Sequence, residues 1–329
     1  MRKNLSVSQR LFWQLGRSIA KNPRTLIGVF ILASLVGSSI LGLALTDDPQ
    51  AFVAEPFEEP SAAHLLGTNG QGQDVLALTL VGTANSLGLA MVTAVFMTAL
   101  GIIIGISAGY WGGRIDLVLS FLTNITLVLP GLPLTIVIAA FLPSGPWTLF
   151  LVLVLTSWAW NARVFRALAQ SLRSKDFITA ARGLGESSMH ILLAEMVPNF
   201  LSPVLSALIG SAIYAIAAQV GLEFLGLGDM NRVSWGTNLY WASNDAALLT
   251  ESWWIFVPTG LAIALVSFAL ALMNEAVDEL SNPTLRAERL WHRRFHGRLE
   301  TGLTPLQDAI ARKHPRGPEQ HHALADARL

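Results

Sequence analysis

Six long hydrophobic runs limit what this chain can fold into. They cover residues 25–45, 84–109, 117–142, 147–162, 200–226 and 253–274. Each run is close to the roughly 20 residues that an α-helix needs to cross a bilayer. Helices also satisfy their own backbone hydrogen bonds, as the hydrocarbon core requires. The sequence therefore predicts an all-α integral membrane protein with six transmembrane helices.

The positions of Lys and Arg predict how these helices are oriented. Of the 22 Lys and Arg residues, 21 fall in residues 1–24, at Arg114, in residues 163–199 or after residue 277, and only Arg232 falls in a loop on the other side. Because cytoplasmic loops are rich in Lys and Arg, both termini are expected in the cytoplasm. The first run is too long for a signal-peptide core and no A-x-A-like site follows, so we expect a retained anchor.

This arrangement divides the chain into three parts. Residues 1–24 are expected to form a basic amphipathic segment on the inner leaflet of the membrane lipid. Residues 25–277 are expected to form a transmembrane domain with an external loop at 46–82 and a cytoplasmic loop at 163–199. Residues 278–329 form a basic cytoplasmic tail that we expect to be partly disordered.

Composition excludes several functions. The chain is 52% hydrophobic and 13% charged with zero formal net charge, which gives no indication of a nucleic-acid partner. There is no Cys, so thiolate metal sites and cysteine nucleophiles are excluded. None of the seven His lies inside a hydrophobic run, which argues against a membrane enzyme. His321-His322 could bind a metal weakly, but a solvated tail is the simpler interpretation, and no metal site is expected.

The cytoplasmic loop at 163–199 has the pattern of two short helices separated by glycine. Asp176 is expected to cap the first helix, on which Phe177, Ala181 and Leu184 share a face. A short helix with small residues on its face is suited to docking in a partner's groove.

The end of that helix is also predicted by residue type. Gly183 and Gly185 allow the turn, Ser187 or Ser188 can cap the next helix, and Pro198 marks re-entry into the membrane.

This loop resembles a known motif. Thr179-Ala-Ala181, three residues, Gly185, nine residues and then Glu195-Met-Val-Pro198 are similar to the EAA loop of ABC importer permeases. In that family the loop forms the coupling helix that contacts the ATPase, which implies this role for Asp176, Phe177, Thr179, Ala180, Ala181, Leu184 and Gly185. The chain departs from the family at Thr179, where Glu is usual, and at Glu195. Without the family, the loop is an ordinary amphipathic cytoplasmic loop.

A second resemblance lies in the external loop. Residues 64–75 are similar to the H-x-L-G-T-D-x-x-G-R-D-V signature of peptide-type permeases, matched at Gly67, Thr68, Gly72 and Asp74. The family Asp is Asn69 here and the family Arg is Gln73. Two further expected arginines are Leu78 and Ala84. Without the family, the glycines and Asn69 are simply turn residues.

Two weaker matches follow in family order. Residues 220–228 resemble the S-F-L-G-L-G stretch that ends the fifth span, with Glu223 in place of a small residue and Phe224 next to it. Glu223 and Phe224 are candidates for a pathway or gate, although the favoured interpretation is that Glu223 lies near the outer interface and reaches water. Residues 274–286 resemble the closing D-x-L-N-P-x-L-R. Asn85, Asn124 and Asn161 are expected to form interhelical hydrogen bonds.

Taken together, residues 11–286 resemble the inner-membrane permease of dipeptide, oligopeptide and nickel-type ABC importers. The resemblance implies a type I importer fold in the inner membrane of a prokaryote. It also implies a second related permease, two cytoplasmic ATP-binding subunits and an extracytoplasmic solute-binding protein as partners. The four lysines lie outside any G-x-x-x-x-G-K-[ST] motif, so ATP and Mg are expected in the partner ATPases, with no cofactor in this chain.

The resemblance favours short peptides as the cargo, with oligosaccharides or metal chelates as alternatives. A secondary carrier would be expected to keep ionisable groups inside the bilayer, and the six runs have none away from their ends. A membrane scaffold stays open as a further alternative.

Overall fold

The computed structural model describes residues 23–281, and this part of the chain is helical. The expectations for the N-terminal amphipathic segment, for the tail beyond residue 281 and for the end of the closing motif lie outside the described residues. The elements in chain order are α2 (Pro23–Leu45), α3 (Val75–Trp111), α4 (Gly113–Val128), α5 (Gly131–Ala140), α6 (Pro146–Arg173), α7 (Asp176–Gly183), α8 (Ser188–His190), the π-helix η1 (Ile191–Met196), the 3₁₀-helix η2 (Val197–Phe200), α9 (Leu201–Phe224), α10 (Trp235–Asn244), the 3₁₀-helix η3 (Trp253–Ile255) and α11 (Val257–Ser281).

Five helices in the described part are long and apolar enough to cross a membrane: α2, α3, α6, α9 and the η3–α11 segment. The sixth predicted span, residues 117–142, is not one straight helix. It consists of α4 and α5, which meet at an angle of 83°. Pro130 lacks a backbone N–H and forces the preceding Leu129 into an extended conformation, so α4 ends there.

Two predicted boundaries also move. α3 begins at Val75 rather than at residue 84, so the last part of the expected external loop is helical. α6 continues to Arg173, so the first eleven residues of the expected cytoplasmic loop extend a membrane helix. The added part of α3, residues 75–83, is mostly apolar, whereas the added part of α6 carries Arg163, Arg166 and Arg173.

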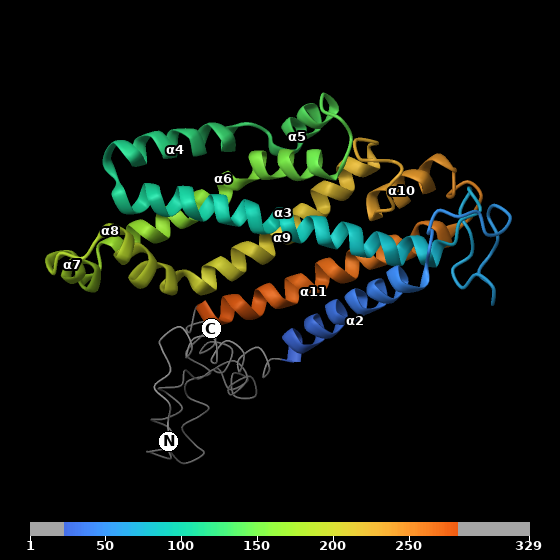
Figure 1. The fold of residues 1–329 in the computed structure, drawn as a ribbon, viewed down its shortest axis with the longest axis horizontal. Coiled ribbons are helices and arrows are strands. Elements are labelled where there is room, and N and C mark those ends of the chain that lie inside the picture. Colours follow the sequence, from blue (N-terminus) through green and yellow to red (C-terminus); the bar gives the residue numbers. More distant parts are fainter. Residues whose placement is uncertain (1–22, 282–329) are drawn as a thin grey trace, which may run out of the picture. The chain divides into compact units, whose positions relative to one another are not determined.

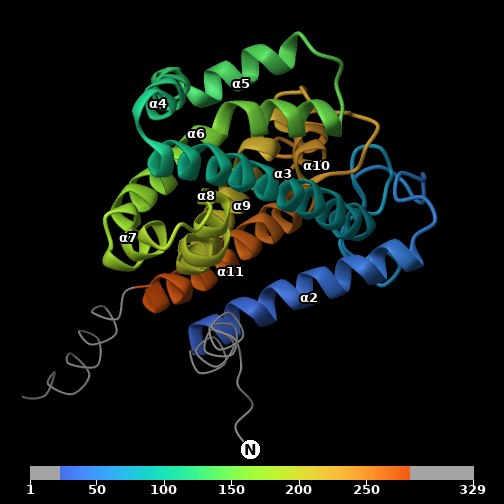
Figure 2. The same cartoon turned by 60° about the vertical axis from the view of Figure 1, so that its left-hand side comes forward.

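The long helices run side by side, with α7 and α8 at one end of the bundle and α10 with the 46–74 loop at the other (Figures 1 and 2). α3 packs against α6, α9 and α2, and α11 packs against α2 and α9.

Glycines allow α3 and α6 to pack closely. Gly101, Gly105 and Gly109 of α3 lie four residues apart and contact α6. A Cβ at Gly109 would lie 2.6 Å from the Ala169 Cβ, and a Cβ at Gly105 would overlap the Ala162 carbonyl oxygen. Small residues at this spacing let two helix backbones approach within a membrane.

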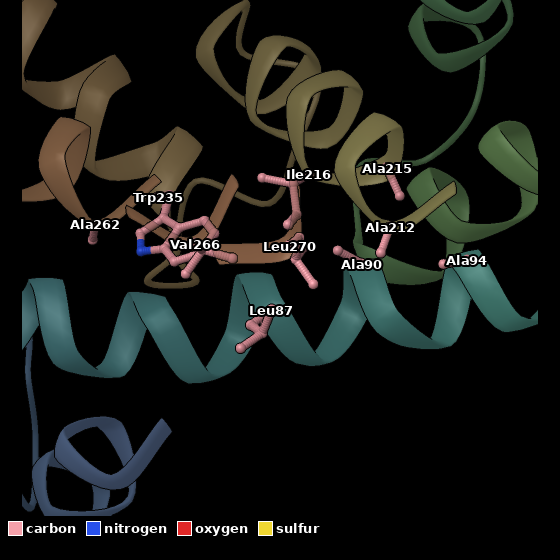
Figure 3. Packing of buried hydrophobic residues seen from close by; sticks show 10 residues of the cluster. All are labelled: Leu87, Ala90, Ala94, Ala212, Ala215, Ile216, Trp235, Ala262, Val266 and Leu270. Atoms are coloured by element: carbon pink, nitrogen blue, oxygen red, sulfur yellow. The ribbon is translucent and has the colours of Figure 1, made fainter. Parts of the chain in front are cut away.

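One of the two main buried clusters joins α3, α9, α10 and α11 around Trp235 (Figure 3). Alanines at positions 90, 94, 212, 215 and 262 supply most of its small side chains. The Trp235 indole Nε1–H donates to Thr83 Oγ1 at 3.1 Å, and the Trp235 backbone N–H donates to Ser86 Oγ at 2.9 Å. The start of α10 is thereby fixed to α3 at one end of the bundle.

Candidate functional site

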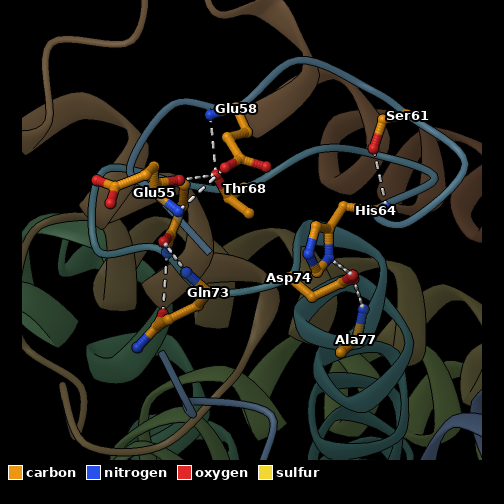
Figure 4. Close-up of polar contacts among 9 residues, drawn as sticks. Glu55, Glu58, Ser61, His64, Thr68, Gln73, Asp74 and Ala77 are labelled. Atoms are coloured by element: carbon orange, nitrogen blue, oxygen red, sulfur yellow. Dashed lines mark hydrogen bonds and ion pairs between the residues drawn. The ribbon is translucent and has the colours of Figure 1, made fainter. Parts of the chain in front are cut away.

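The external signature folds into a hydrogen-bonded loop in front of α3. Thr68 is fully buried, and its hydroxyl donates to the Glu55 carbonyl at 2.6 Å and accepts from the Glu58 N–H at 2.9 Å (Figure 4). The Thr68 carbonyl accepts from the Trp254 indole at 3.2 Å. Thr68 therefore fixes the 46–74 loop to the segment that leads into α11.

The two residues where the signature departs from its family pattern contact each other. Asn69 Nδ2 donates to Gln73 Oε1 at 2.9 Å, and Asn69 Oδ1 accepts the backbone N–H groups of Gln71 and Gln73. Gly67 and Gly72 have φ values of +67° and +69°, as turn glycines do. A neutral amide pair thus closes this turn.

Asp74 caps α3. Its Oδ1 accepts from the Ala77 N–H at 2.9 Å, and its Oδ2 lies 3.0 Å from His64 Nδ1 (Figure 4). An N-cap carboxylate satisfies a backbone donor that the helix leaves free. The contact joins the first residue of the signature, His64, to Asp74 near its end.

Glu223 is buried, with only 5% of its surface exposed, so the interpretation that it reaches water at the interface is wrong. Its carboxylate accepts from Ser234 Oγ at 2.7 Å and from Gln219 Nε2 at 3.2 Å. Gly228 and Gly236 pack directly against its side chain, and a Cβ at either position would collide with it. Burial of Glu223 therefore depends on residues that follow it in the chain. Phe224 is 44% exposed.

The three asparagines form tertiary hydrogen bonds. Asn161 of α6 donates to Ser211 Oγ of α9 at 2.9 Å, and Asn124 of α4 accepts from Arg163 of α6 at 3.1 Å. These two interhelical bonds confirm the prediction. Asn85 of α3 instead donates to the Val233 carbonyl, in the loop before α10.

At the opposite end of the bundle, α7 spans Asp176–Gly183. The predicted cap is wrong by one residue, because Lys175 is the N-cap and makes no side-chain capping bond, whereas Asp176 lies in the first turn. A carboxylate in that turn still interacts favourably with the helix dipole.

The predicted face of α7 is also wrong. Ile178 and Ala181 are buried against α6, α3 and η1, whereas Phe177 is 41% exposed and Leu184 is 83% exposed. Thr179 and Ala180 are exposed as well. Leu184 cannot share the face of Ala181 because the helix ends at Gly183. One side of α7 is therefore bound to the bundle, and the other is open.

The turn after α7 forms as predicted at Gly185, whose φ is +83°. The Gly185 N–H donates to the Arg182 carbonyl at 3.0 Å, and the Glu186 N–H donates to the Ala181 carbonyl at 3.2 Å. These two bonds define a Schellman motif. Ser187 then caps α8 by accepting from the His190 N–H. Gly183 keeps a helical conformation.

Two charged contacts near this end are not predicted from the sequence. Arg166 of α6 forms a bidentate ion pair with Asp116 of α4, with Nε–Oδ1 at 2.5 Å and NH2–Oδ2 at 2.8 Å. The Arg182 guanidinium lies 4.7 Å from the centre of the Tyr110 ring. These contacts connect α4 to α6 and α7 to α3.

A cavity of about 520 Å³ lies between the α4–α5 arm and helices α3, α6 and α9. Its polar lining consists of Thr126, Thr156, Ser157, Asn161, Ser206, Ser211 and Tyr214. No Asp, Glu, Lys, Arg or His is among its lining residues. Within the described residues, no group of three or more His, Asp or Glu could hold a metal ion.

The fold and these sites together define a multi-pass helical membrane protein in which the short helix α7 packs against one end of the bundle. A family model described as "Binding-protein-dependent transport system inner membrane component" matches residues 101–280. The chain belongs to this family, and it is a multi-pass protein of the cytoplasmic membrane.

Relatives of this chain include named transport proteins. The oligopeptide transport system permease protein OppC of Mycobacterium bovis is 32% identical over 236 residues, which cover 71% of this chain and 80% of the relative. The dipeptide transport system permease protein DppC of Bacillus subtilis is 28% identical over 277 residues, which cover 82% and 85%. Among solved structures, an inward-facing MetNI methionine ABC transporter matches with a TM-score of 0.48 and 19% identity, over 61% of this chain and 96% of that chain.

Proposed function

We propose that this chain is a permease subunit of an ATP-driven importer that moves short peptides into the cytoplasm. Membership in the binding-protein-dependent family supports the transport role, and the names of its relatives support the cargo. The family also implies an extracytoplasmic solute-binding protein. A second, related permease and two ATP-binding subunits complete the proposed assembly.

The observation that carries the proposal is the two-sided packing of α7. Ile178 and Ala181 bury one side in the cluster formed by α3, α6 and η1. Phe177, Ala180 and Leu184 leave the other side open. A helix that is packed on its own bundle and exposes apolar side chains is suited to a partner's groove, and its displacement would move the helices that it contacts.

The proposed coupling surface is the exposed part of α7 and its turn. It consists of Asp176, Phe177, Thr179, Ala180, Leu184 and Gly185. Ala181 contributes from the inner side, because it anchors the helix rather than facing a partner. ATP and Mg would be bound by the partner subunits, since the chain has no P-loop motif.

The proposed orientation places α7 in the cytoplasm and the 46–74 loop outside. The distribution of Lys and Arg supports it. α7 and the 46–74 loop lie at opposite ends of the bundle, as this orientation requires (Figure 1).

The cargo is tested by purifying the assembled importer with its binding protein and identifying the retained ligand by mass spectrometry. Peptides that are retained and that stimulate ATP hydrolysis are the expected result. A retained sugar or metal chelate, with peptides failing to stimulate hydrolysis, would replace the peptide assignment.

A further inference from the structure

Two hydrogen-bonded pairs join α6 to α9 on the wall of the 520 Å³ cavity. Ser157 of α6 donates to the Tyr214 hydroxyl of α9 at 3.3 Å, and Asn161 of α6 donates to Ser211 Oγ of α9 at 2.9 Å. Residues four apart on α6 and three apart on α9 lie on one helix face, so the two pairs are about 5 to 6 Å apart. We call these four residues the polar ladder.

The ladder has unused hydrogen-bonding capacity. A tyrosine hydroxyl can donate one hydrogen bond, and the Tyr214 hydroxyl has no acceptor among residues 23–281. The Asn161 side-chain carbonyl likewise has no donor in that part of the chain. A free donor and a free acceptor therefore lie about one helical turn apart on the cavity wall.

The rest of the lining limits what the cavity can hold. About half of its lining residues carry hydroxyl or amide groups, which is unfavourable for a surface that faces lipid chains. The remaining lining is apolar, with Met97, Leu127 and Trp160 among its members. The lining has no charged side chain, so it offers hydrogen bonds but no ionic partner, and the charged termini of a peptide would have to lie outside it.

We propose that the polar ladder binds the main chain of a peptide in transit, with the Tyr214 O–H donating to a peptide carbonyl and the Asn161 carbonyl accepting from a peptide N–H. This inference rests on the proposed function and specifies how the cargo is recognised. Main-chain recognition of this kind tolerates different neutral side chains, because every peptide carries the same amide groups.

The test uses the complete importer in proteoliposomes, with the binding protein loaded either with a tripeptide that has uncharged side chains or with the matching ester in which one amide N–H is replaced by oxygen. The affinity of each ligand for the binding protein is measured separately, and the transport rates are corrected for the difference. The wild-type importer is expected to move the amide about fivefold faster than the ester, as the loss of one hydrogen bond predicts.

Two cavity variants and one control decide the outcome. Asn161→Ala is expected to reduce the ratio of the amide rate to the ester rate to near unity. Tyr214→Phe, which keeps the ring, is expected to slow the transport of both cargoes about fivefold. Tyr240→Phe, outside the cavity, is expected to leave both rates unchanged. Peptide uptake with wild-type rates and preference in both cavity variants would overturn the ladder proposal and leave the proposed function intact. Absence of any peptide uptake by the wild-type importer would overturn both.

Discussion

The side-chain amide of Asn69 donates to the side-chain carbonyl of Gln73, with Nδ2 and Oε1 2.9 Å apart. The signature of peptide-type permeases has Asp at the position of Asn69 and Arg at the position of Gln73. A neutral pair therefore occupies the place where the signature implies an ion pair. The two departures lie in contact, so we interpret them as one compensated change.

This interpretation predicts a coupled pair of substitutions. Gln73→Arg alone places a cation against the Asn69 amide, which is only 4% exposed, and is expected to lower the thermal stability of the purified protein. Asn69→Asp combined with Gln73→Arg is expected to recover stability, with a coupling energy of about 1 kcal/mol. Additive losses in the double variant would contradict the compensation.

The ion pair between Asp116 and Arg166 is expected to hold α4 against α6. Because both side chains keep some contact with solvent, Arg166→Gln is expected to cost about 1 to 2 kcal/mol of folding free energy. Arg166→Lys keeps the charge but loses the bidentate geometry, so its loss of folding free energy should be intermediate. Arg163→Gln, which loses only an exposed bond to Asn124, serves as the control. Unfolding midpoints equal to that of the wild type in all three variants would show that the pair does not stabilise this contact.

Gly185 is expected to be needed for its backbone conformation rather than for space. Its φ is +83°, and an added Cβ would meet nothing within 4 Å. Gly185→Val places a β-branched residue in the left-handed region at a cost of about 1 to 2 kcal/mol, so substrate-stimulated ATP hydrolysis should fall about tenfold. Gly185→Asn should retain most of the activity because Asn tolerates this region.

The matched control for Gly185 is Gly183→Ala, at a helical position that is equally open. It is expected to keep normal hydrolysis. Normal hydrolysis in Gly185→Val as well would remove the proposed role of the turn in coupling.

Asp245 predicts a pH dependence of stability. Burial raises the pKa of Asp245 above its ordinary value of 3.8, and the nearby Gly70 backbone N–H partly opposes this effect. Because its folded-state pKa is raised, the folded state holds the proton more tightly than the unfolded state. The contribution of Asp245 to stability is therefore fully present below pH 3.8 and is lost as the pH rises through the raised pKa.

Asp245→Asn removes this titration and is uncharged at every pH. The difference in unfolding temperature between Asp245→Asn and the wild type should therefore shift in favour of the variant as the pH rises from about 4 to 7. A constant difference across that range would contradict the raised pKa.

Hydrophobic runs predicted where the helices lie, because crossing a bilayer requires length and apolar composition, and both are local properties. The hydrophobic run at residues 117–142 predicts one span, although Pro130 within it indicates the break. Helical spacing predicts Leu184 on the face of Ala181, because a periodic pattern does not indicate that the helix stops at Gly183.

The remaining features depend on tertiary packing. Gly228 and Gly236, later in the chain, pack against the buried Glu223 side chain. Asp116 and Arg166, which form an ion pair, are 50 residues apart in the sequence. A single sequence gives no direct signal for either contact. The polar ladder likewise requires α6 and α9 to be placed side by side.

The coupling of α7 to an ATPase is tested most directly by photo-crosslinking. The chain has no cysteine, so Leu184→Cys can carry a single benzophenone on the exposed end of α7, and Ser61→Cys can carry one in the 46–74 loop. In the assembled importer, the probe at Leu184 is expected to crosslink to an ATP-binding subunit, and the probe at Ser61 is not. Absence of an ATPase adduct from Leu184, or an equal yield from Ser61, would contradict the account.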